Sequence, residues 1–164
     1  MPSPARLDLL KTLAAKVDYL IIGGALANPF LSGQADETLA ALTNAKCELI
    51  HPVDVVVAQE ARDGARENIH AQTISASHIP PNLTALDLGS DSIGDIARCL
   101  EGSKALLWHG PLGACETSPF DNATLIVARH AAMLVRAGRL NCQITGVSLR
   151  AALNQADLLE TLTT

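Results

Sequence analysis

The 164-residue sequence predicts an α/β fold: one domain over residues 1–164, in which a Rossmann-like parallel sheet of about five strands forms the middle of three α/β/α layers. Short β-rich apolar runs alternate with helical patterns along the whole chain, the order that specifies parallel strands covered on both faces. Apolar residues make up 48% of the chain and charged residues 18%, which is enough apolar material for a sizeable core. The length suits a single domain.

The first half of the chain contains five expected segments. In order they are a helix over 4–17, a strand over 18–22, a helix beginning at Asp36, a strand over 47–50 and a β-rich stretch over 53–58. Ser3 and Pro4 form an N-cap and first-turn pair for the first helix, whose leucines recur at helical spacing. The first strand ends at Gly23-Gly24, a pattern typical of a buried strand before a tight turn. The polar segment 59–82 is expected to be mostly loop.

The second half of the chain repeats the alternation. In order we expect a strand over 85–88, a helix up to Gly102, a strand over 105–108, a helix from Asp121 or Asn122 through Ala137, a strand over 143–145 and helical residues 148–162 with a break near Asn154. Ser92 and Asp95 resemble a capping box at the start of the first of these helices. Gly138 follows the long helix at a position that favours a left-handed residue.

Composition and charge exclude several classes of function. The net charge is −5 and only four residues are aromatic, so the platforms on which bases stack have almost no material, and nucleic acid is not an expected partner. No apolar run approaches the roughly 20 residues that cross a bilayer, so we expect no membrane partner. The N-terminus lacks the charged start and apolar core of a secretory signal, which predicts a cytoplasmic protein.

Three glycine-containing segments follow expected strands, at residues 23–31, 109–116 and 146–148. Ligands of an open parallel sheet bind beyond the carboxyl ends of its strands, so these segments are candidate binding loops. A glycine after a strand is also the commonest tight turn, and the dinucleotide and Walker fingerprints are absent. His109, Cys115 and Glu116 carry metal-binding atoms but have no standard spacing, so the sequence predicts no metal site. It predicts no catalytic triad either.

Four motifs occur in a fixed order along the chain, namely Lys16 to Leu31 (KVDYLIIGGALANPFL), Pro52 to Ala58 (PVDVVVA), Leu86 to Gly89 (LDLG) and Trp108 to Glu116 (WHGPLGACE). In sequence and order they resemble the C-terminal, nucleotide-binding domain of phosphoglycerate kinase. The resemblance extends over about residues 14–154. It covers essentially the whole chain but under half of a family member, whose N-terminal domain carries the basic 3-phosphoglycerate site.

The resemblance implies a pocket for adenosine. The matching positions are Gly23, Gly24 and Ala25 beside the adenine, Pro111 beside the nucleotide, Glu116 at the ribose hydroxyls and Gly146 in the family's last glycine-rich stretch. The implied ligand is ADP or ATP, bound weakly, with Mg²⁺ present only together with the nucleotide. The competing interpretation of the paired glycines is a tight turn after a buried strand.

The phosphate end departs from the family. Ser32 replaces the lysine that contacts the transferring phosphate, and His109 replaces an asparagine. Ser148 and Leu149 replace the acid and the hydroxyl residue at a helix N-terminus. Phosphoryl transfer depends on positioning and on electrostatic stabilisation by such groups. We therefore expect no catalytic residues and no ATP:3-phosphoglycerate phosphotransfer in glycolysis by this chain alone, which makes it a pseudoenzyme.

The alternative hypothesis is a non-enzymatic interaction protein. It would form a homo-oligomer, or bind a separate partner chain, through the face that the missing lobe covers in the family. Apolar surface exposed by the absence of that lobe would favour such a contact.

Overall fold

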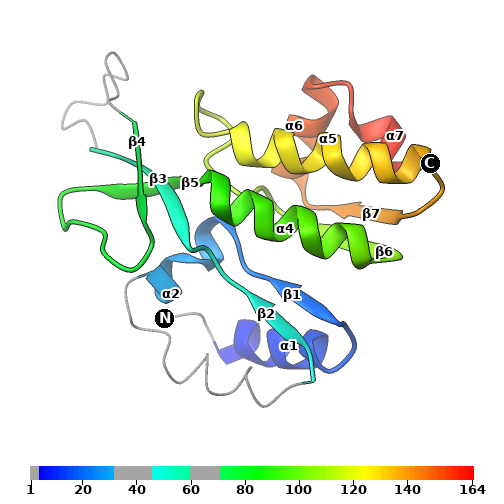
Figure 1. The fold of residues 1–164 in the computed structure, drawn as a ribbon, viewed down its shortest axis with the longest axis horizontal. Coiled ribbons are helices and arrows are strands. Elements are labelled where there is room, and N and C mark those ends of the chain that lie inside the picture. Colours follow the sequence, from blue (N-terminus) through cyan, green and yellow to red (C-terminus); the bar gives the residue numbers. More distant parts are fainter. Residues whose placement is uncertain (1–3, 32–45, 60–70) are drawn as a thin grey trace.

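The computed structural model describes residues 4–31, 46–59 and 71–164, which form an α/β fold (Figure 1). Its elements in chain order are α1 (Pro4–Ala14), β1 (Tyr19–Ile21), η1 (Gly24–Leu26), α2 (Asn28–Leu31), β2 (Glu48–Ile50), β3 (Asp54–Ala58), β4 (Gln72–Ser75), β5 (Thr84–Leu88), α4 (Ser90–Gly102), β6 (Ala105–His109), α5 (Asn122–Arg136), β7 (Asn141–Thr145), α6 (Val147–Gln155) and α7 (Leu159–Thr163). The predicted α/β class is confirmed. The helix expected to begin at Asp36 and the cap at Ser3 lie outside the described residues.

The strands pair in three groups. β1 pairs with β2, and β6 with β7, and both pairs are parallel as predicted. The middle group has the order β4-β3-β5 and is antiparallel throughout. The expectation of one continuous parallel sheet of about five strands is therefore corrected, because the described strands form three separate small sheets.

β4 lies inside the segment 59–82 that the sequence predicts to be mostly loop, and this prediction was wrong at Gln72–Ser75. Ile74 is the single apolar residue of this strand, and it lies opposite Val55 of β3 while its neighbours face solvent. A strand of four residues with one inward apolar side chain has almost no alternation for a pattern to detect.

The main core lies between the helices of the second half and the inner face of the β6–β7 pair. α4 and α5 run side by side (Figure 1), and α5 buries a continuous stripe of small and aliphatic side chains. Trp108 of β6 and Ile144 of β7, which are opposite each other, point into this core. Ile21 and Ile50 of the β1–β2 pair pack against the same cluster, so the two parallel pairs share one core.

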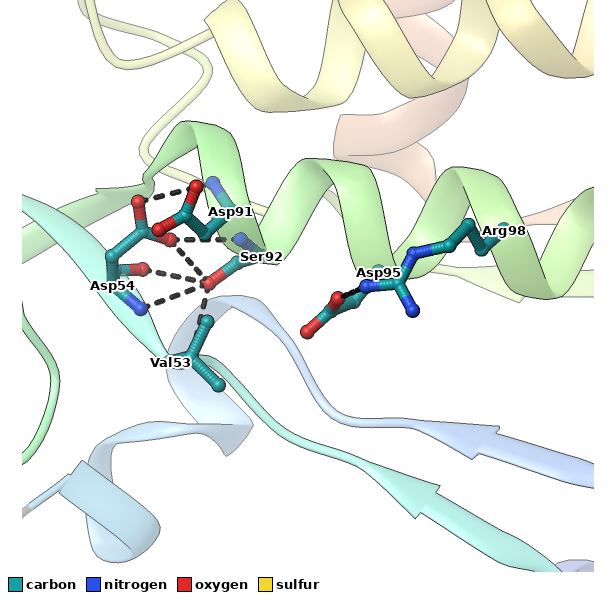
Figure 2. Close-up of polar contacts among 6 residues, drawn as sticks. All are labelled: Val53, Asp54, Asp91, Ser92, Asp95 and Arg98. Carbon is teal, nitrogen blue, oxygen red and sulfur yellow. Dashed lines mark hydrogen bonds and ion pairs between the residues drawn. The ribbon is translucent and has the colours of Figure 1, made fainter.

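The predicted capping box at Ser92 and Asp95 was wrong. α4 begins at Ser90 after Gly89, and no side chain of the helix itself caps it. Instead Asp54 of β3 accepts the N–H groups of Asp91 (3.1 Å) and Ser92 (2.8 Å), as Figure 2 shows. A carboxylate at a helix N-terminus satisfies the free N–H groups and complements the helix dipole. The cap is thus tertiary, which a local sequence pattern does not reveal.

The Ser92 hydroxyl completes this cluster. Its oxygen accepts the N–H groups of Val53 (3.0 Å) and Asp54 (3.1 Å), and it lies 2.7 Å from Oδ1 of Asp54 (Figure 2). Burial alone raises the pKa of Asp54, but the hydrogen bonds from Ser92 and Asp91 outweigh it and hold the pKa below its ordinary value. Asp54 and Ser92 therefore fasten the start of β3 to the start of α4.

The helix ends agree in part with the sequence. α1 ends at Ala14, three residues before the predicted end at residue 17. Gly138 has the expected left-handed conformation, with φ of 67°, after α5. The predicted break in the last helical segment is confirmed, because Asp157 has φ of 55° between α6 and α7.

Within the described ranges, no helix combines the length and the apolar character that a membrane span requires.

Replacing Asp54 by alanine should lower the free energy of unfolding by about 2–4 kcal/mol at neutral pH, because two helix N–H groups and Ser92 lose a charged partner. Since the pKa of Asp54 is lowered, its stabilisation is present above the ordinary value of 3.8 and is lost as the pH falls below it. Urea unfolding measures both effects. Arg98→Ala, which removes the exposed Asp95–Arg98 pair drawn in Figure 2, is the matched control and should change stability by at most about 0.5 kcal/mol. Equal effects of the two variants would contradict the role of Asp54.

Candidate functional site

The turns that follow β1 and β6 meet in direct backbone contact. The N–H of Gly24 donates to the carbonyl oxygen of Leu112 at 3.0 Å. Gly24 has φ of 55°, and a Cβ at this position would overlap the carbonyl oxygen of Pro111. A Cβ on Gly23 would lie 2.7 Å from Cδ2 of Leu112. Gly24 is therefore required for the close approach of the two loops, because it has a left-handed φ and a Cβ would meet backbone, whereas a Cβ at Gly23 would displace only the end of the Leu112 side chain.

A cavity of about 560 Å³ opens beside this contact. Its wall comes from α1, the turn after β1, α2, β3, strand β5 and the loop after β6. The residues are Leu9, Leu10, Gly23, Gly24, Leu26, Ala27, Asn28, Leu31, Val55, Thr84, Ala85, Leu86, Asp87, Leu88, His109, Gly110, Pro111, Leu112, Gly113, Ala114 and Glu116. The volume lies within the range of small-molecule sites, and the mainly apolar wall with a few polar groups is typical of them.

Most of the residues predicted for the nucleoside end come together in this cavity. Gly23, Gly24, Pro111 and Glu116 all line it, although 92 positions separate the first from the last. Ala25 lies in η1 directly after Gly24, and its side chain is outside what the structure describes.

Gly146, the remaining predicted residue, does not line the cavity. It is the N-cap of α6, and its φ of 90° favours glycine. A Cβ on Gly146 would lie 3.3 Å from the backbone nitrogen of Gly110 and 3.6 Å from Cε1 of His109. Gly146 is thus next to the loop that forms the cavity wall.

The phosphate end has no set of charged groups in the described part of the chain. His109 uses Nδ1 to contact Oγ1 of Thr145 at 3.0 Å, which joins the ends of β6 and β7. At the start of α6, Val147 is 87% exposed and Leu149 is fully buried in the core. Ser32 lies outside the described residues.

Asp87 of β5 is a residue of the cavity wall that the sequence analysis did not single out. Its side chain is 3% exposed, and Oδ2 accepts the N–H of Ala123 at the start of α5 (3.0 Å). A Cβ on Gly113 would overlap Oδ1 of Asp87 and would lie close to the carbonyl oxygen of Phe120. Asp87 therefore lies directly behind the cavity loop and fixes it relative to α5. The signal was an acidic residue inside an apolar strand, in the motif LDLG.

Two further features describe this loop. The N–H of Leu112 donates to Oγ1 of the buried Thr124 at 3.0 Å, which is a second link between the loop and α5. Asp121 occupies the N-cap position of α5, but its side chain makes no capping hydrogen bond, so the predicted capping by Asp121 or Asn122 was wrong. Asp87 accepts the N–H of Ala123 in its place.

The charge state of Asp87 follows from its surroundings. Burial raises the pKa of Asp87, the Ala123 N–H lowers it and the nearby Asp121 carboxylate raises it, and the net result is a pKa of about 6. Oδ1 is sealed from solvent and has no hydrogen-bond partner among the described residues. A proton on Asp87 would remove the buried charge.

Metal ligands are not gathered at this site. Across the described ranges, no three His, Cys, Asp or Glu side chains are arranged to hold a metal ion, so His109, Cys115 and Glu116 do not form a centre.

Comparison with known proteins agrees with the motifs. The sequence model of the phosphoglycerate kinase family matches residues 4–163. Phosphoglycerate kinase from Methylorubrum extorquens is 40% identical over 171 residues, covering 94% of this chain and 42% of that protein. The structure of phosphoglycerate kinase from Coxiella burnetii matches with a TM-score of 0.83 and 25% identity, over 97% of this chain and 43% of that one. The phosphoglycerate kinase from Pyrococcus horikoshii, at 15% identity, shares the fold with a TM-score of 0.68, over 93% of this chain and 42% of that one.

The chain therefore belongs to the phosphoglycerate kinase family, and it spans under half the length of the relatives that it matches.

Replacing Asp87 by asparagine should remove a pH dependence of stability. Because the pKa of about 6 in the folded protein exceeds the ordinary 3.8, the folded state binds the proton more tightly than the unfolded state does. The free energy of unfolding of the wild type should therefore rise by up to about 3 kcal/mol as the pH falls from about 7 to about 4. Asp87→Asn should lack this rise. Urea unfolding across this range tests it, and parallel curves for the two proteins would contradict the assignment.

Proposed function

We propose that this member of the phosphoglycerate kinase family is a single nucleotide-binding lobe that binds ADP or ATP weakly and does not catalyse phosphotransfer on its own. The observation that supports the proposal is the cavity lined by Gly23, Gly24, Pro111 and Glu116, in which Gly24 faces Pro111. These are the positions that match the adenosine end of the family's site. A cytoplasmic location, expected from the sequence, stays a prediction.

The chemistry of this wall suits a nucleoside. The glycine backbone and the aliphatic side chains of Leu26 and Leu112 offer a flat apolar surface on which a purine ring can lie. The carboxylate of Glu116 has acceptor atoms for the two hydroxyl groups of a ribose. In this proposal Glu116 gives the orientation and the apolar wall gives most of the affinity.

The residues present do not suit Mg²⁺ or a transferring phosphate. Mg²⁺ prefers carboxylate oxygens, and the family's acid corresponds to Ser148 at the start of α6. The next position is Leu149, whose side chain belongs to the core. Mg²⁺ would therefore enter only as part of the nucleotide complex, and Ser148 and Leu149 supply no charge to stabilise a developing phosphoryl group.

The acceptor substrate has no counterpart in this cavity. A phosphorylated carboxylic acid such as 3-phosphoglycerate requires several cationic donors, and the described lining residues include neither lysine nor arginine. This favours a binding function over the family's whole reaction.

Calorimetry with adenosine, ADP and ATP should show millimolar or tighter binding, with little or no loss of affinity when the phosphates are removed. A coupled assay with ADP and 1,3-bisphosphoglycerate should detect no ATP above background. Glu116→Ala should weaken adenosine binding by about tenfold, the effect of losing a charged hydrogen-bond acceptor. Glu160→Ala, on the exposed side of α7, is the matched control and should bind like the wild type. No heat with any of the three ligands, or turnover near that of ordinary kinases, would refute the proposal.

A second candidate function, self-association, is favoured by one observation. Leu107 of β6 is 57% exposed on the face of the β6–β7 pair that is opposite the core. Parallel strands are normally covered on both faces, so this face lacks its usual cover within the described part of the chain. Ala105, Gln143 and Asn141 on the same face are exposed and uncharged, so two copies could meet there without charge repulsion.

If this face joins two copies, light scattering should show a dimer whose fraction rises with concentration. Leu107→Asp should shift the protein to monomer, because the contact would bury a charge without a partner. Met133→Asp, at an exposed site on α5, is the control and should leave the dimer unchanged. Monomer alone at every concentration would contradict the second candidate.

A further inference from the structure

The described wall of the cavity contains acidic residues without a basic counterpart. These are Glu116 and Asp87, and the carboxylate of Asp87 is buried directly behind the loop after β6. Among the described residues of the wall there is no lysine and no arginine. A binding site for a phosphate ester normally has several such cations, or a cluster of backbone N–H groups, directed at the ligand.

Several described arginines are engaged elsewhere. Arg139 contacts Glu101 at 2.8 Å, and Arg136 contacts Thr161 at 3.2 Å on α7. Arg150 of α6 directs Nη1 to the carbonyl oxygen of Ile144, at 3.4 Å. None of these side chains lines the cavity, so none offsets its acidic groups at short range.

The rest of the wall strengthens the effect of these charges. Leu10, Leu26, Leu31 and Val55 line the cavity with aliphatic groups, which screen a charge far less than water does. A ligand that fills the cavity also displaces the water that would otherwise screen Glu116. An anionic ligand therefore meets more repulsion here than it would at an open surface.

The N-terminus of α6 does not compensate. Gly146 and the residues after it are outside the cavity wall, so a phosphate would reach the helix only beyond His109. A helix dipole is equivalent to roughly half a positive charge at its N-terminus. Whenever Asp87 is ionised, the negative charge of the two acidic residues is larger than this partial positive charge.

We propose that the cavity discriminates by charge, and that it binds an uncharged purine nucleoside more tightly than the corresponding mono-, di- or triphosphate. This inference rests on the proposed function, since it assumes that the cavity takes the adenosine end of the ligand. The ligand class is then a neutral nucleoside, and each added phosphate lowers the binding affinity. Affinity then falls in the order adenosine, AMP, ADP, ATP. A site that binds the phosphates directly gives the reverse order.

The test is calorimetry on the full chain with adenosine, AMP and ADP, without Mg²⁺, at about 20 mM and about 0.5 M salt. Adenosine should bind at least about threefold more tightly than ADP at low salt, and high salt should bring the two affinities together by screening the repulsion. Glu116→Gln should also narrow the ratio, because it removes one negative charge and keeps a hydrogen-bonding side chain. Glu160→Gln is the control for a charge change far from the cavity and should keep the wild-type ratio.

The outcomes separate the two proposals. Binding of both ligands with ADP equal to or tighter than adenosine at low salt would overturn the charge discrimination and leave the proposed function intact. A ratio that is insensitive to salt and to Glu116→Gln would also overturn it, because the preference would then not be electrostatic. Absence of binding by all three ligands would overturn the proposed function and this inference together. Circular dichroism and thermal unfolding of both variants establish that they are folded.

Discussion

The structure depends on how closely the ends of β1 and β6 approach each other. The hydrogen bond from the N–H of Gly24 to the carbonyl oxygen of Leu112 brings two backbones into contact, which leaves no room for a Cβ at Gly24. This contact joins the two parallel strand pairs, which are not hydrogen-bonded to each other as strands. The cavity exists beside it because the loop after β6 turns back over the end of β1 and does not extend into solvent.

Two buried carboxylates keep the surrounding helices in register with the strands. Asp54 holds the start of α4 and Asp87 the start of α5, so each helix is capped from a neighbouring strand and not from its own sequence. The two acids differ in what surrounds them. Asp54 receives the N–H groups of Asp91 and Ser92 and the Ser92 hydroxyl, which favour its charged form, whereas burial and Asp121 disfavour the charge on Asp87. The loop that lines the cavity is thus packed against Asp87, the carboxylate whose charged form is the less favoured of the two.

The sequence predicts the parts of this molecule that depend on local pattern. The strands around Leu20 and Leu106 are apolar runs, those around Leu49 and Ile144 are short β-rich segments between helical patterns, and α5 has a clear helical period, so all were expected. Pairing between strands is a property of the whole chain, and the antiparallel group around β3 was missed for that reason. The two tertiary caps were missed because Asp54 and Asp87 are distant in sequence from the helices that they hold. The residues at the nucleoside end of the site were predicted from the order of the family motifs along the chain. That order indicated that Gly23, Gly24, Pro111 and Glu116 lie close together, which the spacing of the residues alone does not indicate.

The two ends of the predicted nucleotide site differ in what the fold requires of them. Gly24 lies against Pro111 and Gly23 against Leu112, so these positions have a structural role even in a chain that binds nothing. Exposed positions at the phosphate end, such as Val147, can change without cost to the core. Glu116 is different from both, because it lines the cavity and its side chain makes no hydrogen bond or ion pair with the described residues. Its retention has no structural explanation within the described residues, and so it is the position at which a binding function and a merely inherited fold can be told apart.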